Sequence, residues 1–205
     1  MARLSKTDHN RVIAAIAAAE RQTAAEFAVA VVASADDYAE PRLLIPALFA
    51  ILSSPLLLAV GFVRDPLWLA TIPCIVFGLA SATLLPDQVA VRLVPVRLRT
   101  RRVRRLAQSL FVELGLAAPR DRAGVLLFVA RAEHQVEILA GAGVAERVDS
   151  GAWQAVVDGF VAAARSGPLA EALIGAVEVS TAVLSKAFPA ADNEPNEVPN
   201  RLIDR

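Results

Sequence analysis

The sequence predicts an α/β fold that is interrupted by a pair of membrane-spanning helices. Two long apolar windows occupy the middle of the chain, strand-like apolar segments lie on both sides of them, and segments with helical apolar spacing surround the strands. With 205 residues, the chain is long enough for one domain of ordinary size. Its hydrophobic content of 56% excludes a disordered polymer.

Charge and cysteine content exclude several classes of protein. Lys and Arg together number 21, as do Asp and Glu, so the zero net charge gives no overall attraction to nucleic acid. One Cys and two His are too few for a disulfide framework or for a zinc cluster built from these residues.

The first forty residues predict one helix and one strand. Residues 9–22 carry apolar side chains at helical spacing, and Asp8 precedes them as the predicted N-cap. Residues 27–33 (FAVAVVA) are apolar on both faces, which is typical of a central strand covered by helices. Residues 34–40 are polar and acidic, and predict a loop after that strand.

The two apolar windows predict transmembrane helices over about residues 43–63 and 67–85. Neither window contains a charged residue, and a helix of either length is about 30 Å long, the thickness of the hydrocarbon core of a bilayer. Only three residues separate the windows, so they predict a tight hairpin. Prolines inside them are tolerated in membrane helices where a neighbour satisfies the freed carbonyl. The alternative is a pair of fully buried helices in a soluble protein, which is unusual for so short a chain.

An arginine cluster follows the second window and predicts the orientation of the hairpin. Arginine in the turn is limited to Arg64, so the positive-inside rule places both chain ends and the α/β domain in the cytoplasm, at the inner face of the cell membrane. The cluster is also predicted to lie on anionic lipid headgroups. Aromatic residues do not interleave it, which argues against nucleic acid. Its predicted membrane-surface residues are Arg97, Arg99, Arg101, Arg102, Arg104 and Arg105.

The second half of the chain predicts two strands and three helices. Residues 124–130 and 135–140 are strand-like, and the short segment between them predicts an antiparallel hairpin. Apolar residues recur at helical spacing from 103 to 114, from 151 to 165 and from 169 to 188. Either Asp149 or Ser150 is the predicted N-cap of the helix over 151–165. Gly141, Ala142 and Gly143 predict a turn.

Neither half of the α/β sequence can bury a core alone. We therefore expect one discontinuous domain made of residues 1–40 and 88–189, interrupted by a hairpin over residues 41–87. Residues 190–205, rich in Asn, Glu and Pro, predict a disordered tail.

The α/β part of the sequence contains, in order, the segments AERQTAAEF (19–27), SADDY (34–38), Ala107 to Leu110 with Phe111 and Gly115, GVLLFV (124–129), EHQVEI (133–138), GAG (141–143) and Phe188–Pro189. The order of these segments resembles the TPM domain family, and the resemblance covers nearly all of the chain outside residues 41–100. The resemblance implies a small α/β/α sandwich of the TPM type and a bacterial membrane branch in which a hairpin splits the domain.

Some members of that family are associated with acid phosphatase activity, or with calcium bound by acidic residues at the strand ends. Asp36, Asp37 and Asp149 are the candidate metal ligands, and calcium the candidate cofactor, because a hard cation requires several carboxylates at one edge of the sheet. Asp121, Glu133 and Glu137 are further acids near that edge. The alternative is that all these acids are solvated loop residues and helix caps. Ala123, Glu133-His134 and Ala142 depart from the family pattern and favour that alternative.

Two functions from different classes follow. The first is a non-enzymatic module of unknown specific activity, held at the cytoplasmic membrane face and acting through lipid or an unidentified protein partner. The second is a membrane-bound phosphatase or calcium-dependent hydrolase that uses the acids at the sheet edge. His134 beside Glu133 is a candidate general base, although a histidine in a surface turn is usually only solvated.

Overall fold

The computed structural model describes residues 4–61, 65–84, 87–117, 123–190 and 202–204. The chain divides into two compact units, and each is described by itself. The first unit, here called the α/β unit, contains Met1–Ala35 and Arg102–Arg205. The second, the hairpin unit, contains Asp36–Arg101.

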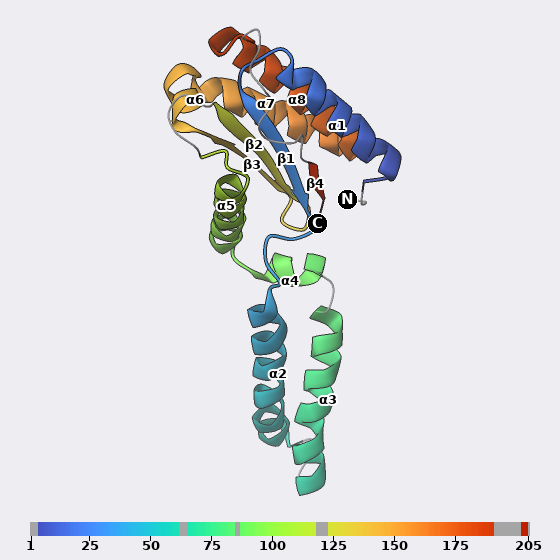
Figure 1. Ribbon diagram of the computed structural model, residues 1–205. Coiled ribbons are helices and arrows are strands. Elements are labelled where there is room, and N and C mark those ends of the chain that lie inside the picture. The colour runs from blue at the N-terminus through green and yellow to red at the C-terminus, as the bar shows by residue number, and fades with distance from the viewer. Residues whose placement is uncertain (1–3, 62–64, 85–86, 118–122, 191–201, 205) are drawn as a thin grey trace. The chain divides into compact units, whose positions relative to one another are not determined.

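Eight helices and four strands occupy the described residues (Figure 1). The helices are α1 (Lys6–Glu20), α2 (Ala39–Val60), α3 (Pro66–Leu84), α4 (Asp87–Leu93), α5 (Val96–Glu113), α6 (Ala142–Arg147), α7 (Ser150–Ser166) and α8 (Leu169–Ala187). The strands are β1 (Glu26–Val32), β2 (Gly124–Ala130), β3 (Gln135–Ala140) and β4 (Leu202–Asp204). The predicted α/β class is confirmed, and the three predicted strands lie within one residue of their expected bounds.

The sheet is mixed, with the strand order β3-β2-β1-β4. β1 and β2 pair in parallel over their whole length, from Glu26 opposite Gly124 to Val32 opposite Ala130. β2 and β3 form the expected antiparallel hairpin. β4 pairs in parallel with the other side of β1. β1 is therefore the internal strand that its two-sided apolar sequence predicted.

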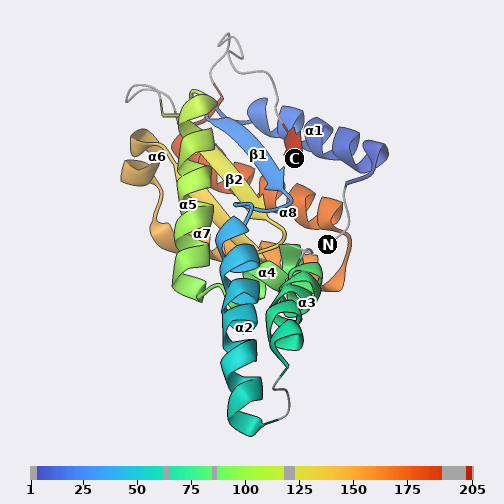
Figure 2. The same ribbon diagram turned by 90° about the horizontal axis from the view of Figure 1, so that it is seen from below.

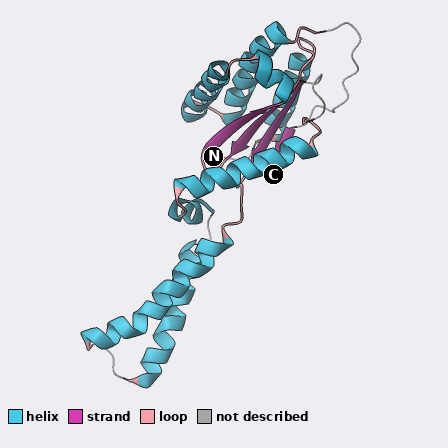
Figure 3. Ribbon diagram, turned by 90° about the vertical axis from the view of Figure 1, so that its left-hand side faces the viewer, coloured by secondary structure: helices cyan, strands magenta, loops and turns pink. Residues whose placement is uncertain are grey.

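Alternate side chains of β1 enter two separate cores because successive residues of a strand point to opposite faces. Phe27, Val29 and Val31 join a core formed with α1, α7 and α8. The intervening residues of β1 join a second core, formed with α5. Figure 3 shows the strands between these two helical layers.

Helix α5 covers its face of the sheet through one apolar stripe. Val103, Ala107 and Leu110 are buried in the core against β1 and β2. Figure 2 shows the helix lying along this face. The opposite side of α5 is exposed and carries the arginines considered below.

Three local predictions need correction or refinement. Ser5, not Asp8, is the N-cap of α1, and its hydroxyl accepts the Asp8 N–H at 3.1 Å. Of the two predicted N-cap candidates for α7, Asp149 is the cap, and its carboxylate accepts the Gly151 N–H at 2.7 Å. The predicted turn at 141–143 is wrong, because Gly141 caps the short helix α6.

The predicted disordered tail is wrong for three residues, which form β4. Leu202 is 9% exposed and belongs to the core shared with α8, so an apolar side chain with a place in the core offsets the cost of ordering the strand. Residues 191–201 and 205 of the predicted tail lie outside the described residues.

In the hairpin unit, α2 and α3 pack against each other. The predicted span ends at residues 63 and 85 lie outside the described residues. Pro73 has no N–H for the Leu69 carbonyl four residues before it, and the Ser54 hydroxyl of α2 donates to this carbonyl at 2.8 Å. A side chain of one helix thus satisfies the carbonyl freed in the other.

Candidate functional site

The carboxyl ends of β1, β2 and β4 meet at one edge of the sheet because these three strands are parallel. In open α/β sheets, ligands bind at this edge. The segments that reach it are Ser34–Ala35 after β1, residues 131–134 after β2, and Asp204 at the end of β4. We take this edge of the α/β unit as the candidate functional site.

The turn between β2 and β3 is held against the end of β1 by backbone bonds. The Arg131 N–H donates to the Val32 carbonyl at 3.0 Å, and the Ala132 N–H donates to the Ala33 carbonyl at 2.9 Å. His134 closes the turn in the left-handed conformation, with φ at 53°. Its ring is exposed and Nδ1 lies 3.2 Å from the Ala132 carbonyl oxygen, so the turn holds this candidate base at the surface.

Glu133 is a buried carboxylate within this turn. It is 4% exposed, and its Oε1 accepts the Ser34 hydroxyl at 3.1 Å and the Ala35 N–H at 2.9 Å. Since an ionised acceptor strengthens such bonds, Glu133 joins the segment after β2 to the segment after β1. Its role in the described structure is to hold the β2–β3 turn against the end of β1.

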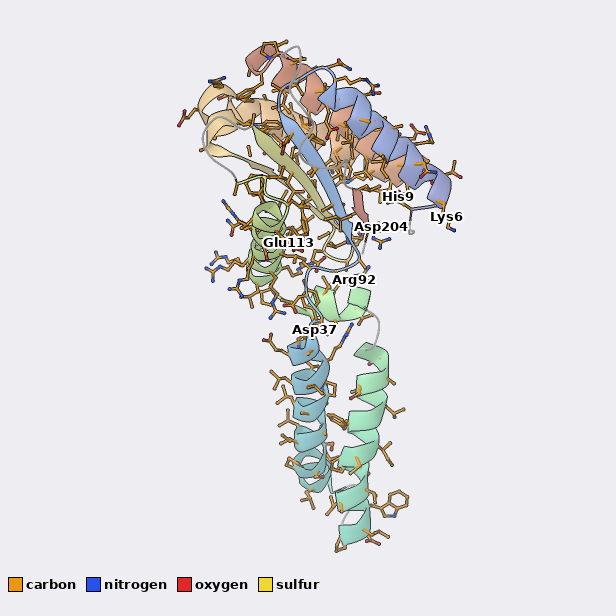
Figure 4. All side chains as sticks on the ribbon, in the orientation of Figure 1. Lys6, His9, Asp37, Arg92, Glu113 and Asp204 are labelled. Carbon is orange, nitrogen blue, oxygen red and sulfur yellow. The ribbon has the colours of Figure 1, made fainter. Side chains whose placement is uncertain are left out.

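A pair of opposite charges lies at the same edge of the sheet. The Arg131 Nη2 lies 3.8 Å from the Asp204 Oδ1, and both side chains are 11% exposed. Figure 4 labels Asp204 at the end of β4. The sequence analysis missed both residues. The signal that could have found Asp204 is the apolar-apolar-acid triplet Leu202-Ile203-Asp204, which stands out after a polar segment.

Asp36 and Asp37 belong to the hairpin unit, where they shape the chain before α2. The Asp36 carboxylate accepts the Asp37 N–H at 2.8 Å, and the Asp37 carboxylate accepts the Ala39 N–H at 3.2 Å. The Ala39 N–H, followed by the Asp36 side chain, lowers the pKa of Asp37. A lowered pKa keeps this carboxylate charged to lower pH, and its capping contribution is lost as the pH falls through that pKa.

The three predicted metal ligands are divided between the two units. Asp36 and Asp37 lie in the hairpin unit, whereas Asp149 caps α7 in the α/β unit. Within the described part of the chain, no group of three or more His, Cys, Asp or Glu side chains could hold a metal ion. Asp121 lies outside the described residues, and Glu137 is half-buried on β3. The calcium site and the hydrolase activity stay predictions.

The arginines predicted to lie at the membrane surface are all on α5. Positions 97, 101, 104 and 105 share one side of the helix, and Arg97, Arg101, Arg104 and Arg105 are exposed there. Arg99 and Arg102 are half-buried. We call the four exposed residues the arginine stripe. It faces away from the buried stripe of Val103, so packing leaves these charges available to solvent or headgroups.

The hairpin unit contains two helices, α2 and α3, that are long and apolar enough to cross a membrane by length and composition. Of the most apolar window of each helix, 11% is buried in α2 and none in α3. Large apolar side chains such as Leu44, Ile51 and Val60 are more than two-thirds exposed. Figure 4 shows mostly carbon along both helices.

Comparison with known proteins agrees with the predicted resemblance. The family model of the TPM domain matches residues 86–183. Over that range the chain is similar to TPM domains. The family resemblance noted over residues 19–38 lies outside the matched range. No curated protein matches the sequence.

This chain is also similar in structure to the BA42 protein from the psychrophilic bacterium Bizionia argentinensis, determined by NMR. The TM-score is 0.62 at 16% sequence identity, and the similarity covers 98% of this chain and 95% of BA42. At this identity the two proteins share a fold, and the activity of one says nothing of the other.

We predict that Glu133→Ala lowers the free energy of unfolding by about 1–3 kcal/mol, because Ala35 loses the acceptor of its N–H. Glu133→Gln, which keeps an acceptor oxygen, is expected to cost less. Urea unfolding of the full chain in detergent, followed by Trp153 fluorescence in a Trp68→Phe background, measures both changes. Glu178→Ala on the exposed side of α8 is the control. A Glu133→Ala variant as stable as this control would contradict the structural role of the carboxylate.

Proposed function

We propose that this chain is a membrane-anchored TPM domain protein without enzymatic activity. In this proposal α2 and α3 cross the cell membrane as a hairpin, the α/β unit lies in the cytoplasm, and the protein acts through lipid or protein contacts at the membrane face. The specific activity and the protein partner are unknown.

The exposed apolar surface of α2 and α3 is the observation that carries the proposal. A buried Leu, Ile or Val gains roughly 1.5–3 kcal/mol over an exposed one, so a water-soluble chain would forgo this gain at many positions along the two helices. Lipid removes that penalty. The Ser54–Leu69 bond supports the same conclusion, because a freed carbonyl in a hydrocarbon solvent requires a donor from a neighbouring helix.

The distribution of arginine supports the proposed orientation. The turn between α2 and α3 carries one arginine, Arg64. The segment after α3 carries the arginine stripe together with Arg99 and Arg102. Positively charged segments close to a membrane helix are retained in the cytoplasm. The chain ends therefore stay on the cytoplasmic side in this proposal.

The arginine stripe is the proposed lipid contact. Its four guanidinium groups are exposed on one side of α5, beginning at Arg97, thirteen positions after the last residue of α3. Each arginine close to an anionic bilayer contributes about 1 kcal/mol of attraction. The helix can offer its charges to headgroups without disturbing the sheet, because a different stripe of α5 contacts the core.

We also propose that residues 1–40 and 88–189 form one discontinuous domain and that residues 41–87 are an insertion. The pairing of β1 with β2 supports this proposal, because residues 33–123 separate these strands in the chain. A strand that is buried on both faces and pairs with a partner so far away in sequence requires both segments in one folded body.

We predict that the full chain stays in the membrane pellet after a sodium carbonate wash. A fluorescent protein fused after Arg205, of a kind that matures only in the cytoplasm, is expected to fluoresce. The same fusion placed within residues 62–64 is expected to stay dark because the turn lies outside. Release of the intact chain into the supernatant, or fluorescence from the turn fusion, would contradict the anchor or its orientation.

Replacing residues 41–87 with a short Gly/Ser linker is expected to leave a folded, soluble domain, because no described residue of this segment belongs to either core of the sheet. Circular dichroism and a cooperative urea transition are the measurements. A second variant with the same linker in place of residues 26–72 loses β1 and is the control, expected to stay unfolded. Aggregation of the first variant, beside a full chain that is well behaved in detergent, would argue against the insertion.

Replacing the arginine stripe with glutamine is expected to reduce the anionic lipid that purifies with the protein. The change is Arg97→Gln, Arg101→Gln, Arg104→Gln and Arg105→Gln together, and mass spectrometry of co-purified phosphatidylglycerol measures it. The control removes the same charge from exposed positions elsewhere: Lys6→Gln, Arg21→Gln, Arg165→Gln and Lys186→Gln. Equal lipid retention by the two variants would argue against the stripe as the contact.

A further inference from the structure

Within the described residues, the edge of the sheet beside β1 is paired over part of its length. β1 has seven residues, and β4 pairs with three of them, placing Leu202 opposite Val29, Ile203 opposite Ala30 and Asp204 opposite Val31. β4 is the last strand of the sheet order (Figure 1). The described ladder between β1 and β4 contains few backbone hydrogen bonds. We therefore expect the side chains of β4 to determine which sequence binds at the edge of β1.

Each side chain of β4 has a distinct neighbour in the α/β unit. Leu202 enters the core shared with α1 and α8, and Ile203 packs against the core on the opposite face of the sheet. Asp204 lies beside Arg131 at the carboxyl edge. The edge of β1 therefore accepts two apolar side chains on opposite faces, followed by an acid.

Arg131 provides the preference for the acid. Its side chain is 11% exposed, and its buried Nε has no hydrogen-bond partner within the described ranges. Asp204 is the acid paired with this cation among the described residues. A buried guanidinium without an anionic neighbour is strongly unfavourable, so a neutral or basic residue at this position would bind much less well.

Few described contacts join β4 to the rest of the α/β unit. The chain is attached after α8, where the Thr23 hydroxyl donates to the Phe188 carbonyl at 2.6 Å and Thr23 bridges to Pro189. Residues 190–201 separate this attachment from β4. Among the described residues, release of β4 breaks its ladder with β1, the apolar contacts of Leu202 and Ile203, and the pair with Arg131.

We propose that the edge of β1 is a docking site for an extended peptide with the sequence pattern apolar, apolar, acidic, and that β4 is the chain's own exchangeable occupant. The partner is an extended segment of another protein that adds a parallel strand to the sheet. Backbone bonds to β1 hold the peptide, and Arg131 selects the acid. β4 competes with the partner for the edge of β1. The apparent affinity of the chain for the partner is therefore proportional to the fraction of chains in which β4 is released.

The probe for this proposal is a fluorescent hexapeptide with the sequence of residues 200–205, Asn-Arg-Leu-Ile-Asp-Arg. Fluorescence anisotropy measures its binding to the full chain in detergent. Asp204→Arg places a like charge beside Arg131 and weakens β4, so this variant is expected to bind the probe at least about tenfold more tightly than the natural chain. A second probe with Asn in place of Asp is expected to bind that variant more weakly.

Two variants control for the change of charge. Asp158→Arg makes the same change at an exposed position of α7 and is expected to bind the probe like the natural chain. Arg131→Glu combined with Asp204→Arg restores an opposite-charge pair and removes the selecting cation, so probe binding is expected to be lost. Equal binding by Asp204→Arg and Asp158→Arg, or equal binding of the Asp and Asn probes, overturns the proposal.

Hydrogen exchange of the natural chain keeps the proposal falsifiable if Asp204→Arg does not fold. The amides of residues 202–204 are expected to exchange faster than those paired between β2 and β3. Excess unlabelled hexapeptide is expected to speed their exchange further while β1 stays protected. Exchange at residues 202–204 that is as slow as in β2 and unchanged by the peptide overturns the proposal.

Discussion

The parallel pairing of β1 with β2 is the interaction on which the rest of the α/β unit depends. Both strands are apolar on both faces and buried along nearly their whole length. Such strands are stable only when helices cover the two faces of the sheet. This requirement places α1, α7 and α8 on one face and α5 on the other. Because residues 33–123 connect the paired strands, the hairpin unit lies within a crossover connection, where a long insertion costs little conformational free energy.

The same pairing creates the polar edge of the sheet. Parallel strands bring their carboxyl ends together, and the chain must turn there with its backbone groups satisfied. Glu133 does this for the segment after β1, and Asp204 places a negative charge beside Arg131. Asp37 and Asp149 instead accept backbone N–H groups two residues ahead of them. Such local bonds are the common use of aspartate at helix starts.

The hairpin unit follows a different rule, because its helices have few buried side chains. Prolines inside these helices free backbone carbonyl groups, and each freed carbonyl requires a hydrogen-bond donor. At Pro73 the freed Leu69 carbonyl receives the Ser54 hydroxyl from the other helix. The sequence analysis predicted that prolines would require such a donor, but the choice of Ser54 depends on the register in which α2 packs against α3.

The sequence alone determined the helices and strands with strong patterns. β1, β2 and β3 were predictable within a residue because two-sided apolar runs and a short connecting turn are local signals. The sequence limited the N-cap of α7 to Asp149 or Ser150, and the folded backbone selects Asp149. The residue that caps α1 was not predictable, because Ser5 and Asp8 both stand before the apolar pattern and only the folded backbone selects between them.

Contacts between segments far apart in the chain determined the features that the sequence did not predict, namely β4 and the pairs at the carboxyl edge of the sheet. β4 has three residues, too few for a periodic signal, and it is ordered because β1 offers it an edge and two cores. The Arg131–Asp204 pair joins residues 73 positions apart, and the Glu133–Ala35 bond spans 98. No local pattern encodes such pairs, since each partner looks like an ordinary surface residue until the sheet brings the strand ends together.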